Sequence, residues 1–297
     1  MRPGLASSPL CLVLLAALAP ARAQEDPGAR GPRAVEWVKV KVPKVGWFGT
    51  HLQVRYPRGP VAPGPVVLIC HGWAAGSCKF VPLAEHLASR GIVAASFKQP
   101  DIFSSDLPRW GRQLRAGLDA LLAAGRDPRS PLFGRLDPGR VALLGHSYGA
   151  AASVLVASQD LSLRGVVGLA TVNQPHRALL LESGARLRGP LLLVTGQRDP
   201  LATTRGYVLP LFQAAAGAAR RELLEVAGGG HDLYVGSGER AALARRHATA
   251  WLEHALGLRP ADAWIDGRTA RRDRDAGALS RIELGPGGIA AVLGPGS

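Results

Sequence analysis

The sequence predicts an α/β fold in which helices cover both faces of a mostly parallel, doubly wound sheet. Short apolar runs of strand length alternate with longer segments of helical periodicity along most of the chain. Several of the short runs are continuously apolar, as parallel strands buried on both faces are. One of these runs leads directly into Gly-His-Ser-Tyr-Gly at residues 145–149, and a helical segment follows it. The 297-residue chain suits one large domain of this kind.

The N-terminus predicts a signal peptide over residues 1–23. Arg2 gives a basic start, residues 10–19 are apolar, and the stretch ends in Ala21-Arg22-Ala23. The apolar run has about ten residues where a membrane span needs about 20, so no stable membrane anchoring is expected. We therefore expect a secreted or periplasmic protein whose α/β domain occupies residues 24–257.

The first half of the domain predicts two half-buried strands followed by buried elements. Apolar and polar residues alternate over Val35–Val42 and again over Leu52–Tyr56, which indicates an edge hairpin or meander. Continuous apolar runs predict buried strands, and segments with one apolar face predict helices. The strands are expected at Pro65–Cys70, Ile92–Phe97 and Val141–Leu144, and the helices at Phe80–Arg90, Ser105–Ala124 and Ala150–Val156.

The second half continues the alternation. Strands are expected at Val166–Ala170, Leu191–Thr195 and Glu222–Val226, and a helix at Glu239–Leu256. The gap of about 18 residues between Val172 and Leu191 has room for one short helix at Arg177–Ser183, so no cap domain and an open cleft are expected. Residues 258–284 are expected to pack partly on the domain, and the Gly/Pro-rich residues 285–297 to be disordered.

The composition argues against nucleic acid as a partner. The formal net charge is +14, and removing Arg2 and Arg22 with the signal peptide leaves +12. Such a charge could attract nucleic acid or anionic polymers. Only five of the 36 basic residues are lysine, however, and no basic helix with interleaved aromatic residues is present. A general bias toward Ala, Gly, Pro and Arg accounts for the charge.

The cysteines leave one structural question open. Cys70 and Cys78 remain after removal of the signal peptide, so at most one intramolecular disulfide can form between them. Either a bridge or two free thiols is compatible with the sequence. No residues have metal-ligand spacing and no glycine-rich phosphate loop is present, so no metal or cofactor is expected.

The Gly-His-Ser-Tyr-Gly pattern predicts a nucleophile, Ser147. A G-x-S-x-G sequence between a buried strand and a helix is typical of a nucleophile elbow, a tight turn that raises the serine hydroxyl above the sheet. The glycines two residues to either side leave space for this turn.

A nucleophilic serine requires a base and an orienting acid. Asp199 follows the strand Leu191–Thr195, and His231 follows the glycines that come after the last predicted parallel strand. Ser147, Asp199 and His231 thus occur in the chain order typical of such folds. Asp160 is expected about 20 Å from the serine, at the far end of the next helix. The remaining alternatives as base are less suitable in chain order or in position; they are His176, His247 and His254.

Two backbone amides are candidates for an oxyanion hole. One is the N–H of Tyr148, directly after the nucleophile, and the other is the N–H of Trp73, in the loop after Cys70. His71 is expected to brace this loop by hydrogen bonds. Trp73, Tyr148 and Phe103 are expected to line the cleft as substrate-binding residues.

With these residues, the chain resembles the α/β-hydrolase superfamily, and within it the secreted cutinase and poly(ethylene terephthalate) hydrolase branch, near the dienelactone-hydrolase-like group. The resemblance covers about residues 60–257 and includes residues 83–91 and Arg112-Gln113-Leu114. The chain departs from the family at Tyr148, where a methionine is usual, in lacking a tryptophan at residues 171–175, and in lacking a C-terminal disulfide. The resemblance therefore implies ester hydrolysis more strongly than a polyester substrate.

The sequence thus predicts a secreted serine carboxylic-ester hydrolase, expected to be a monomer, that works through an acyl-enzyme without a cofactor. Ser147 would attack the ester, His231 would take its proton, and Asp199 would hold the imidazole. An exported acyltransferase with the same triad is the main alternative, since it differs only in that an alcohol, instead of water, receives the acyl group. A non-catalytic binding protein is a weaker alternative.

Overall fold

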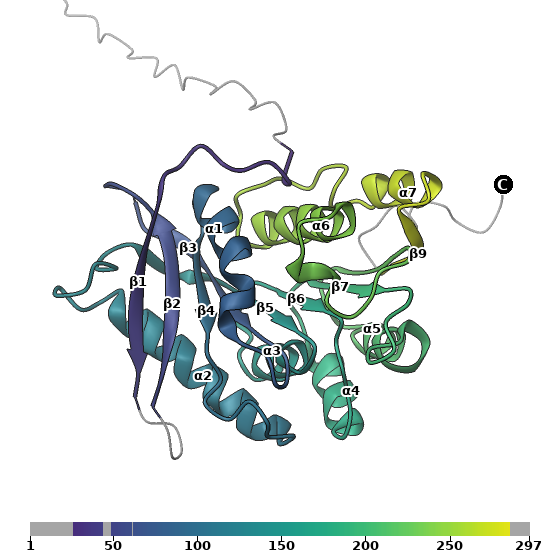
Figure 1. The fold of residues 1–297 in the computed structure, drawn as a ribbon, viewed down its shortest axis with the longest axis horizontal. Coiled ribbons are helices and arrows are strands. Elements are labelled where there is room, and N and C mark those ends of the chain that lie inside the picture. Colours follow the sequence, from purple (N-terminus) through teal and green to yellow (C-terminus); the bar gives the residue numbers. More distant parts are fainter. Residues whose placement is uncertain (1–25, 44–48, 61, 286–297) are drawn as a thin grey trace, which may run out of the picture.

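The computed structural model describes residues 26–43, 49–60 and 62–285. The predicted signal peptide and nearly all of the tail predicted to be disordered lie outside these residues. The described chain forms one nine-stranded sheet with the order β1-β2-β4-β3-β5-β6-β7-β8-β9 (Figure 1). The strands are β1 (Val35–Val42), β2 (Thr50–Pro57), β3 (Gly64–Cys70), β4 (Val93–Phe97), β5 (Leu136–His146), β6 (Val166–Leu169), β7 (Leu191–Gly196), β8 (Arg221–Val226) and β9 (Leu279–Leu284).

The central strands of the sheet are parallel, as the continuous apolar runs predict. Neighbouring strands from β4 to β8 pair in parallel, whereas β1 with β2, β2 with β4 and β8 with β9 pair antiparallel. The helices are α1 (Val81–Ser89), α2 (Leu107–Ala124), α3 (Tyr148–Gln159), α4 (Arg177–Arg186), α5 (Leu209–Ala214), α6 (Glu239–Ala255) and α7 (Arg268–Asp275). None of the described helices is both long and apolar enough to cross a membrane.

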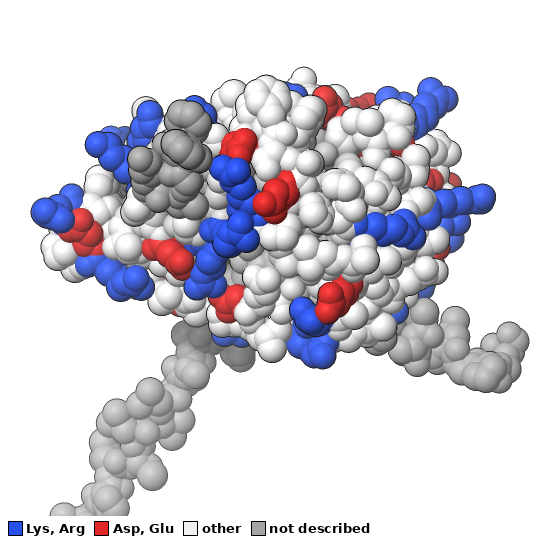
Figure 2. Space-filling view, turned by 90° about the horizontal axis from the view of Figure 1, so that it is seen from below, with Lys and Arg blue, Asp and Glu red and all other residues white. Residues whose placement is uncertain are grey.

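The carboxyl ends of the parallel strands meet at one edge of the molecule. This edge lies at the bottom of Figure 1, and Figure 2 shows the molecule from that side. Lys and Arg side chains there are interspersed with Asp and Glu around a broad uncharged area. The loops that follow β3, β5, β7 and β8 all emerge at this edge, because parallel strands run in the same direction.

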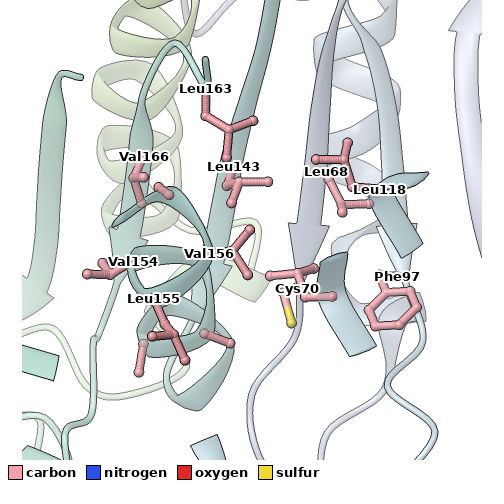
Figure 3. Close-up of a cluster of buried hydrophobic side chains, with 14 of the residues drawn as sticks. Leu68, Cys70, Phe97, Leu118, Leu143, Val154, Leu155, Val156, Leu163 and Val166 are labelled. Atoms are coloured by element: carbon pink, nitrogen blue, oxygen red, sulfur yellow. The ribbon is translucent and has the colours of Figure 1, made fainter. Parts of the chain in front are cut away.

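Two hydrophobic cores form because successive residues of each strand face opposite sides of the sheet. Leu68 and Cys70 of β3 pack in the core that contains buried residues of α2, α3, α4 and α5, whereas Val67 and Ile69 pack in the core that contains α1 and α6. The first core includes Leu68 and Leu143 of the strands, Leu118 of α2 and residues 154–156 of α3 (Figure 3). Helices therefore cover both faces of the sheet, as in a doubly wound fold.

The connection between β6 and β7 decides how open this edge is. Residues 170–190, all of which the structure describes, contain the single helix α4, three residues longer than the predicted Arg177–Ser183. The fold therefore has no cap domain inserted between these strands.

The segment after α6 contributes more to the fold than its sequence indicates. Residues 258–284 contain α7 and β9, and β9 pairs antiparallel with β8 to extend the sheet by one strand. Ile265, Ala270 and Leu279 are each buried to 2% exposure or less in the core with α6. The sequence does not predict this pairing, because Leu279–Leu284 is short and three of its six residues are polar or charged.

A buried carboxyl group lies where this segment joins the sheet. Glu222 of β8 pairs with Leu284 of β9, is 2% exposed, and its Oε1 has no hydrogen-bond partner among the described residues. Burial raises the pKa of Glu222 from 4.5 to about 8. The folded chain therefore keeps this proton at pH values where the unfolded chain has lost it.

We expect the free energy of unfolding to fall as pH rises from about 5 to about 8, by up to about 1.4 kcal/mol per pH unit from this group. Above pH 8 the loss is complete. Glu222→Gln removes the titration, so its advantage in melting temperature over wild type should be larger at pH 9 than at pH 5. Thermal unfolding at both pH values measures this, with the exposed Glu239→Gln as control. An equal difference in melting temperature between Glu222→Gln and wild type at both pH values would contradict this prediction.

Candidate active site

Ser147 occupies a strained turn between β5 and α3. Its φ of 55° and ψ of −120° lie outside the regions that most residues with a Cβ adopt. The flanking glycines are required because the turn is tightly packed. A Cβ on Gly145 would lie 2.3 Å from the carbonyl oxygen of Gly149, and one on Gly149 would lie 2.3 Å from the carbonyl oxygen of His71. The hydroxyl of Ser147 is thereby presented at the carboxyl edge of the sheet.

The structure brings Ser147, His231 and Asp199 together in one chain of hydrogen bonds. His231 Nε2 lies 3.0 Å from Ser147 Oγ, and His231 Nδ1 lies 2.8 Å from Asp199 Oδ2. Asp199 is 3% exposed, and its Oδ1 accepts hydrogen bonds from the amides of Leu201 and Ala202 at 2.8 and 2.9 Å. The carboxylate is therefore held on one side by backbone and on the other by the imidazole.

The charge of Asp199 fixes the tautomer of His231. Burial alone would raise the pKa of the Asp199 carboxyl, but hydrogen bonds from His231 and from the amides of Ala202 and Leu201 outweigh burial and lower this pKa. An ionised carboxylate only accepts hydrogen bonds, so the proton of a neutral His231 sits on Nδ1. Nε2 is then free to accept the hydroxyl proton of Ser147.

The alternative acid and bases are occupied elsewhere. Asp160 follows the C-terminus of α3 and bonds to Arg115 and Ser162. Each alternative histidine also has a hydrogen-bond partner other than Ser147. His176 Nε2 lies 2.9 Å from the carbonyl oxygen of Ser105, His247 Nε2 lies 2.9 Å from Asp273 Oδ2, and His254 Nδ1 lies 3.1 Å from the carbonyl oxygen of Arg259.

The loop after β3 lies against Ser147. A Cβ on Gly72 would approach Ser147 Cβ to 2.8 Å, so only glycine allows this contact. His71 braces the loop, because its Nδ1–H donates to the carbonyl oxygen of Gly72 at 2.8 Å while its Nε2 accepts from the amide of Gln99 at 3.0 Å. Burial lowers the pKa of His71, which is consistent with this neutral form.

This brace orients the peptide bond between Gly72 and Trp73. The Gly72 oxygen also accepts from the amide of Ala75 at 3.2 Å, so the carbonyl is fixed by two donors. In a trans peptide the N–H points opposite to the C=O, which turns the Trp73 N–H away from His71. Among the described residues the Trp73 N–H has no acceptor. The Tyr148 N–H is the first amide of α3 and is one of the donors that a helix leaves unpaired.

A cavity of about 490 Å³ opens over Ser147. The residues that line it come from the loops after β3, β4, β5, β6, β7 and β8 and from the segment before α5. They are Gly72, Trp73, Ala74, Ala75, Lys79, Ser105, His146, Ser147, Tyr148, Val172, Gln174, Pro200, Leu201, Tyr207, His231 and Asp232. The volume is in the range of pockets that hold small organic ligands.

The three aromatic residues expected in the cleft have different positions. Trp73 lines the cavity and is 52% exposed. Tyr148 also lines it but is 4% exposed, because its hydroxyl donates to the carbonyl oxygen of Ser105 and its ring meets Trp110 edge-on, 5.1 Å between centroids. Phe103 does not line the cavity. It is 68% exposed and contacts the Trp73 ring edge-on at 5.8 Å, so its predicted place in the cleft is corrected to a support beside Trp73.

Several cavity residues were not predicted from the sequence. Lys79 and Asp232 form a loose ion pair, 3.8 Å from Nζ to Oδ1, and Tyr207 comes from the helical turn before α5. His146 could have been suspected, since it adjoins Ser147 in the turn. Lys79 and Tyr207 carry no local signal, because only the fold brings their segments to this edge. No group of three or more His, Cys, Asp and Glu residues that could hold a metal ion occurs in the part of the chain that the structure describes.

The two cysteines near this loop are free thiols in the structure. Cys70 is buried at the end of β3 and Cys78 is exposed in the turn before α1. Burial raises the pKa of Cys70 to about 12, so this thiol stays protonated and unreactive in the folded protein.

Of these two residues, we therefore expect only Cys78 to react with iodoacetamide at neutral pH in the native protein, and both to react after unfolding in urea. Peptide mapping by mass spectrometry measures the extent of alkylation at each position. A peptide pair linked through Cys70 and Cys78 in the unreduced protein would contradict the free thiols.

A serine on a strained turn between a parallel strand and a helix, with partners from later strand ends, defines an α/β-hydrolase fold. Residues 19–257 match the family model described as PETase, PET hydrolase-like, and the chain belongs to this family. The match confirms the resemblance to the cutinase and poly(ethylene terephthalate) hydrolase branch.

Curated relatives support the same branch at lower identity. A bis(hydroxyethyl) terephthalate hydrolase of Streptomyces coelicolor is 29% identical over 66% of this chain and 60% of its own length. Cutinase 2 of Thermobifida cellulosilytica is 26% identical over 60% of this chain and 64% of its own, and cutinase cut1 of Thermobifida fusca is 26% identical over 60% and 52%. The chain thus spans between about half and two thirds of the length of these relatives.

Proposed function

We propose that this protein is a carboxylic-ester hydrolase that works through an acyl-enzyme on Ser147. The observation that carries the proposal is the unbroken series of hydrogen bonds from Ser147 through His231 to Asp199. The backbone amides of Trp73 and Tyr148, which have no other acceptor among the described residues, are available to stabilise an oxyanion. The names of the relatives, which are cutinases and a bis(hydroxyethyl) terephthalate hydrolase, support this chemistry.

In the first half of the reaction, Ser147 Oγ attacks the ester carbonyl carbon while its proton passes to His231 Nε2. The carbonyl oxygen becomes an oxyanion, which the N–H groups of Trp73 and Tyr148 stabilise. Asp199 lies against the Nδ1–H of His231 and stabilises the imidazolium that forms. The intermediate collapses when the bond to the alcohol oxygen breaks, and that oxygen takes the proton from His231.

In the second half, water replaces the alcohol. His231 removes a proton from the water molecule as it attacks the acyl carbon, and the imidazolium then returns this proton to Ser147 Oγ. The products are the carboxylic acid and the free serine. An acyltransferase would differ only at this step, where a second alcohol would attack the acyl carbon in place of water.

Assay of soluble esters tests the proposal. We expect hydrolysis of p-nitrophenyl esters of short to medium acyl chains and of bis(hydroxyethyl) terephthalate, with free acid as the product. Product analysis in the presence of added acceptor alcohol distinguishes the alternative. A product that is mainly the new ester would favour an acyltransferase, and absence of turnover on every ester would refute both.

The absence of a cap between β6 and β7 leads to a prediction about the physical state of the substrate. The cavity lies at an open edge, and Trp73 and Leu201 at its lining are more than half exposed. Because no cap has to move, we expect the rate on tributyrin to rise smoothly as its concentration passes the solubility limit. Titration of the released acid measures this rate. A sharp increase at the limit would contradict the open cleft.

We also propose that the chain is exported and cleaved after Ala23. The sequence of residues 1–23 supports this proposal. Determination of the N-terminal residue of the protein recovered outside the cell tests it, and a protein retained inside the cell with Met1 intact would refute it.

A further inference from the structure

A second buried imidazole touches the backbone of the base. His146 is the last residue of β5, directly before Ser147, and is 4% exposed. Its Nε2 lies 3.0 Å from the backbone carbonyl oxygen of His231, and the two rings are 4.9 Å apart between centroids. A carbonyl oxygen only accepts hydrogen bonds, so His146 Nε2 carries the hydrogen and donates it.

His146 is itself held on several sides. Its backbone pairs with Leu169 of β6, so its position is fixed within the parallel sheet. The ring lies against Phe80 at 5.8 Å and against Tyr234 at 5.7 Å, and the hydroxyl of Tyr234 donates to the carbonyl oxygen of Val194 at 2.7 Å. A donor on such a fixed side chain has little freedom to move away from its acceptor.

The segment that carries His231 is held at Gly228 and Gly229 by backbone hydrogen bonds, because these residues have no side chains to pack. It begins with Gly228, Gly229 and Gly230, and Gly228 has a φ of +62°. Glycines give the backbone conformational freedom, and ordering them has a high entropic cost. The hydrogen bond from His146 joins this loop to the strand that bears the nucleophile, because His146 and Ser147 are consecutive residues.

We propose that His146 is a positioning residue, whose neutral imidazole holds the His231 carbonyl and thereby keeps the base within hydrogen-bond distance of Ser147. This inference rests on the proposed ester hydrolysis. Burial lowers the pKa of His146 to about 4, so the ring stays neutral beside an imidazole that gains charge during each turnover. A cation at this position would repel the imidazolium of His231.

The test compares a variant that keeps the donor with one that keeps only the ring. His146→Phe retains an aromatic ring but has no hydrogen to donate, whereas the amide of His146→Gln can reach the same carbonyl. Misplacing a reacting group by about 1 Å can cost about 10²-fold in rate. We expect His146→Phe to lower kcat by about 10- to 100-fold with KM within about twofold. His146→Gln should recover most of the lost kcat.

The chain offers a matched control in His86. This buried histidine makes the same kind of bond, Nε2 to the carbonyl oxygen of Pro27 at 2.9 Å, which joins α1 to the N-terminal segment. His86→Phe should leave kcat within about twofold, because it removes a similar bond without affecting His231. Equal kcat values for His146→Phe and wild type, or no recovery in His146→Gln, would overturn the proposal.

A measurement on the wild-type protein covers the case in which His146→Phe does not fold. Nitrogen NMR of the histidine rings should show His146 neutral at pH 7 with its hydrogen on Nε2. A hydrogen on Nδ1 instead, or a charged ring, would overturn the proposal. Failure of the proposed function is a separate outcome, because wild type would then show no ester hydrolysis at all.

Discussion

Replacing Ser147 with alanine is expected to lower kcat for ester hydrolysis by a factor on the order of 10⁶, the loss seen on removing the nucleophile of another triad enzyme. The acyl-enzyme cannot form without Oγ, which lies 3.0 Å from His231 Nε2. The remaining groups, His231 and the two amides, have no covalent intermediate to act on. Initial rates on a p-nitrophenyl ester measure the loss.

Ser158→Ala is the matched control. Ser158 lies on α3, the helix that follows Ser147, is 7% exposed, and its hydroxyl bonds to the helix backbone at Leu155. Activity of this variant should stay within about twofold of wild type, because a hydroxyl bonded to its own helix contributes little to stability. A fluorophosphonate that labels wild type and Ser158→Ala should not label Ser147→Ala. Near-wild-type turnover in Ser147→Ala would exclude the proposed mechanism.

The sequence was most informative where local pattern and topology act together. Ser147, Asp199 and His231 were predicted as neighbours because each follows a parallel strand, and such strands end at one edge of the sheet. The structure places His231 within hydrogen-bond distance of both Ser147 and Asp199. The glycines around Ser147 carry a signal of the same kind, since the turn leaves no room for a Cβ.

Features that depend on contacts between distant segments were not predictable in this way. β9 pairs with β8 across more than 50 residues, and its own sequence is too polar to indicate a strand in the sheet. Phe103 was expected to line the cleft, but it lies outside the cavity lining and contacts the ring of Trp73 edge-on. The bond from His146 to the His231 carbonyl joins residues 85 positions apart.

Replacing Asp199 with asparagine is expected to lower kcat by a factor on the order of 10⁴, as the same change does in a serine protease. The surroundings of the side chain explain why. The amides of Leu201 and Ala202 both donate to Oδ1, so the side-chain oxygen of the introduced asparagine would take that place. Its NH₂ group would then face His231 Nδ1, at the position of Oδ2.

This arrangement reverses the tautomer of the base. An NH₂ group donates to Nδ1, so the hydrogen of a neutral His231 moves to Nε2 and points at Ser147 Oγ. Nε2 then cannot accept the hydroxyl proton, although every heavy atom keeps its position. Asp160→Asn is the matched control, since Asp160 is the alternative acid and bonds to Arg115 and Ser162. Its kcat should stay within about threefold of wild type. A larger loss in Asp160→Asn than in Asp199→Asn would show that Asp199 does not orient the base.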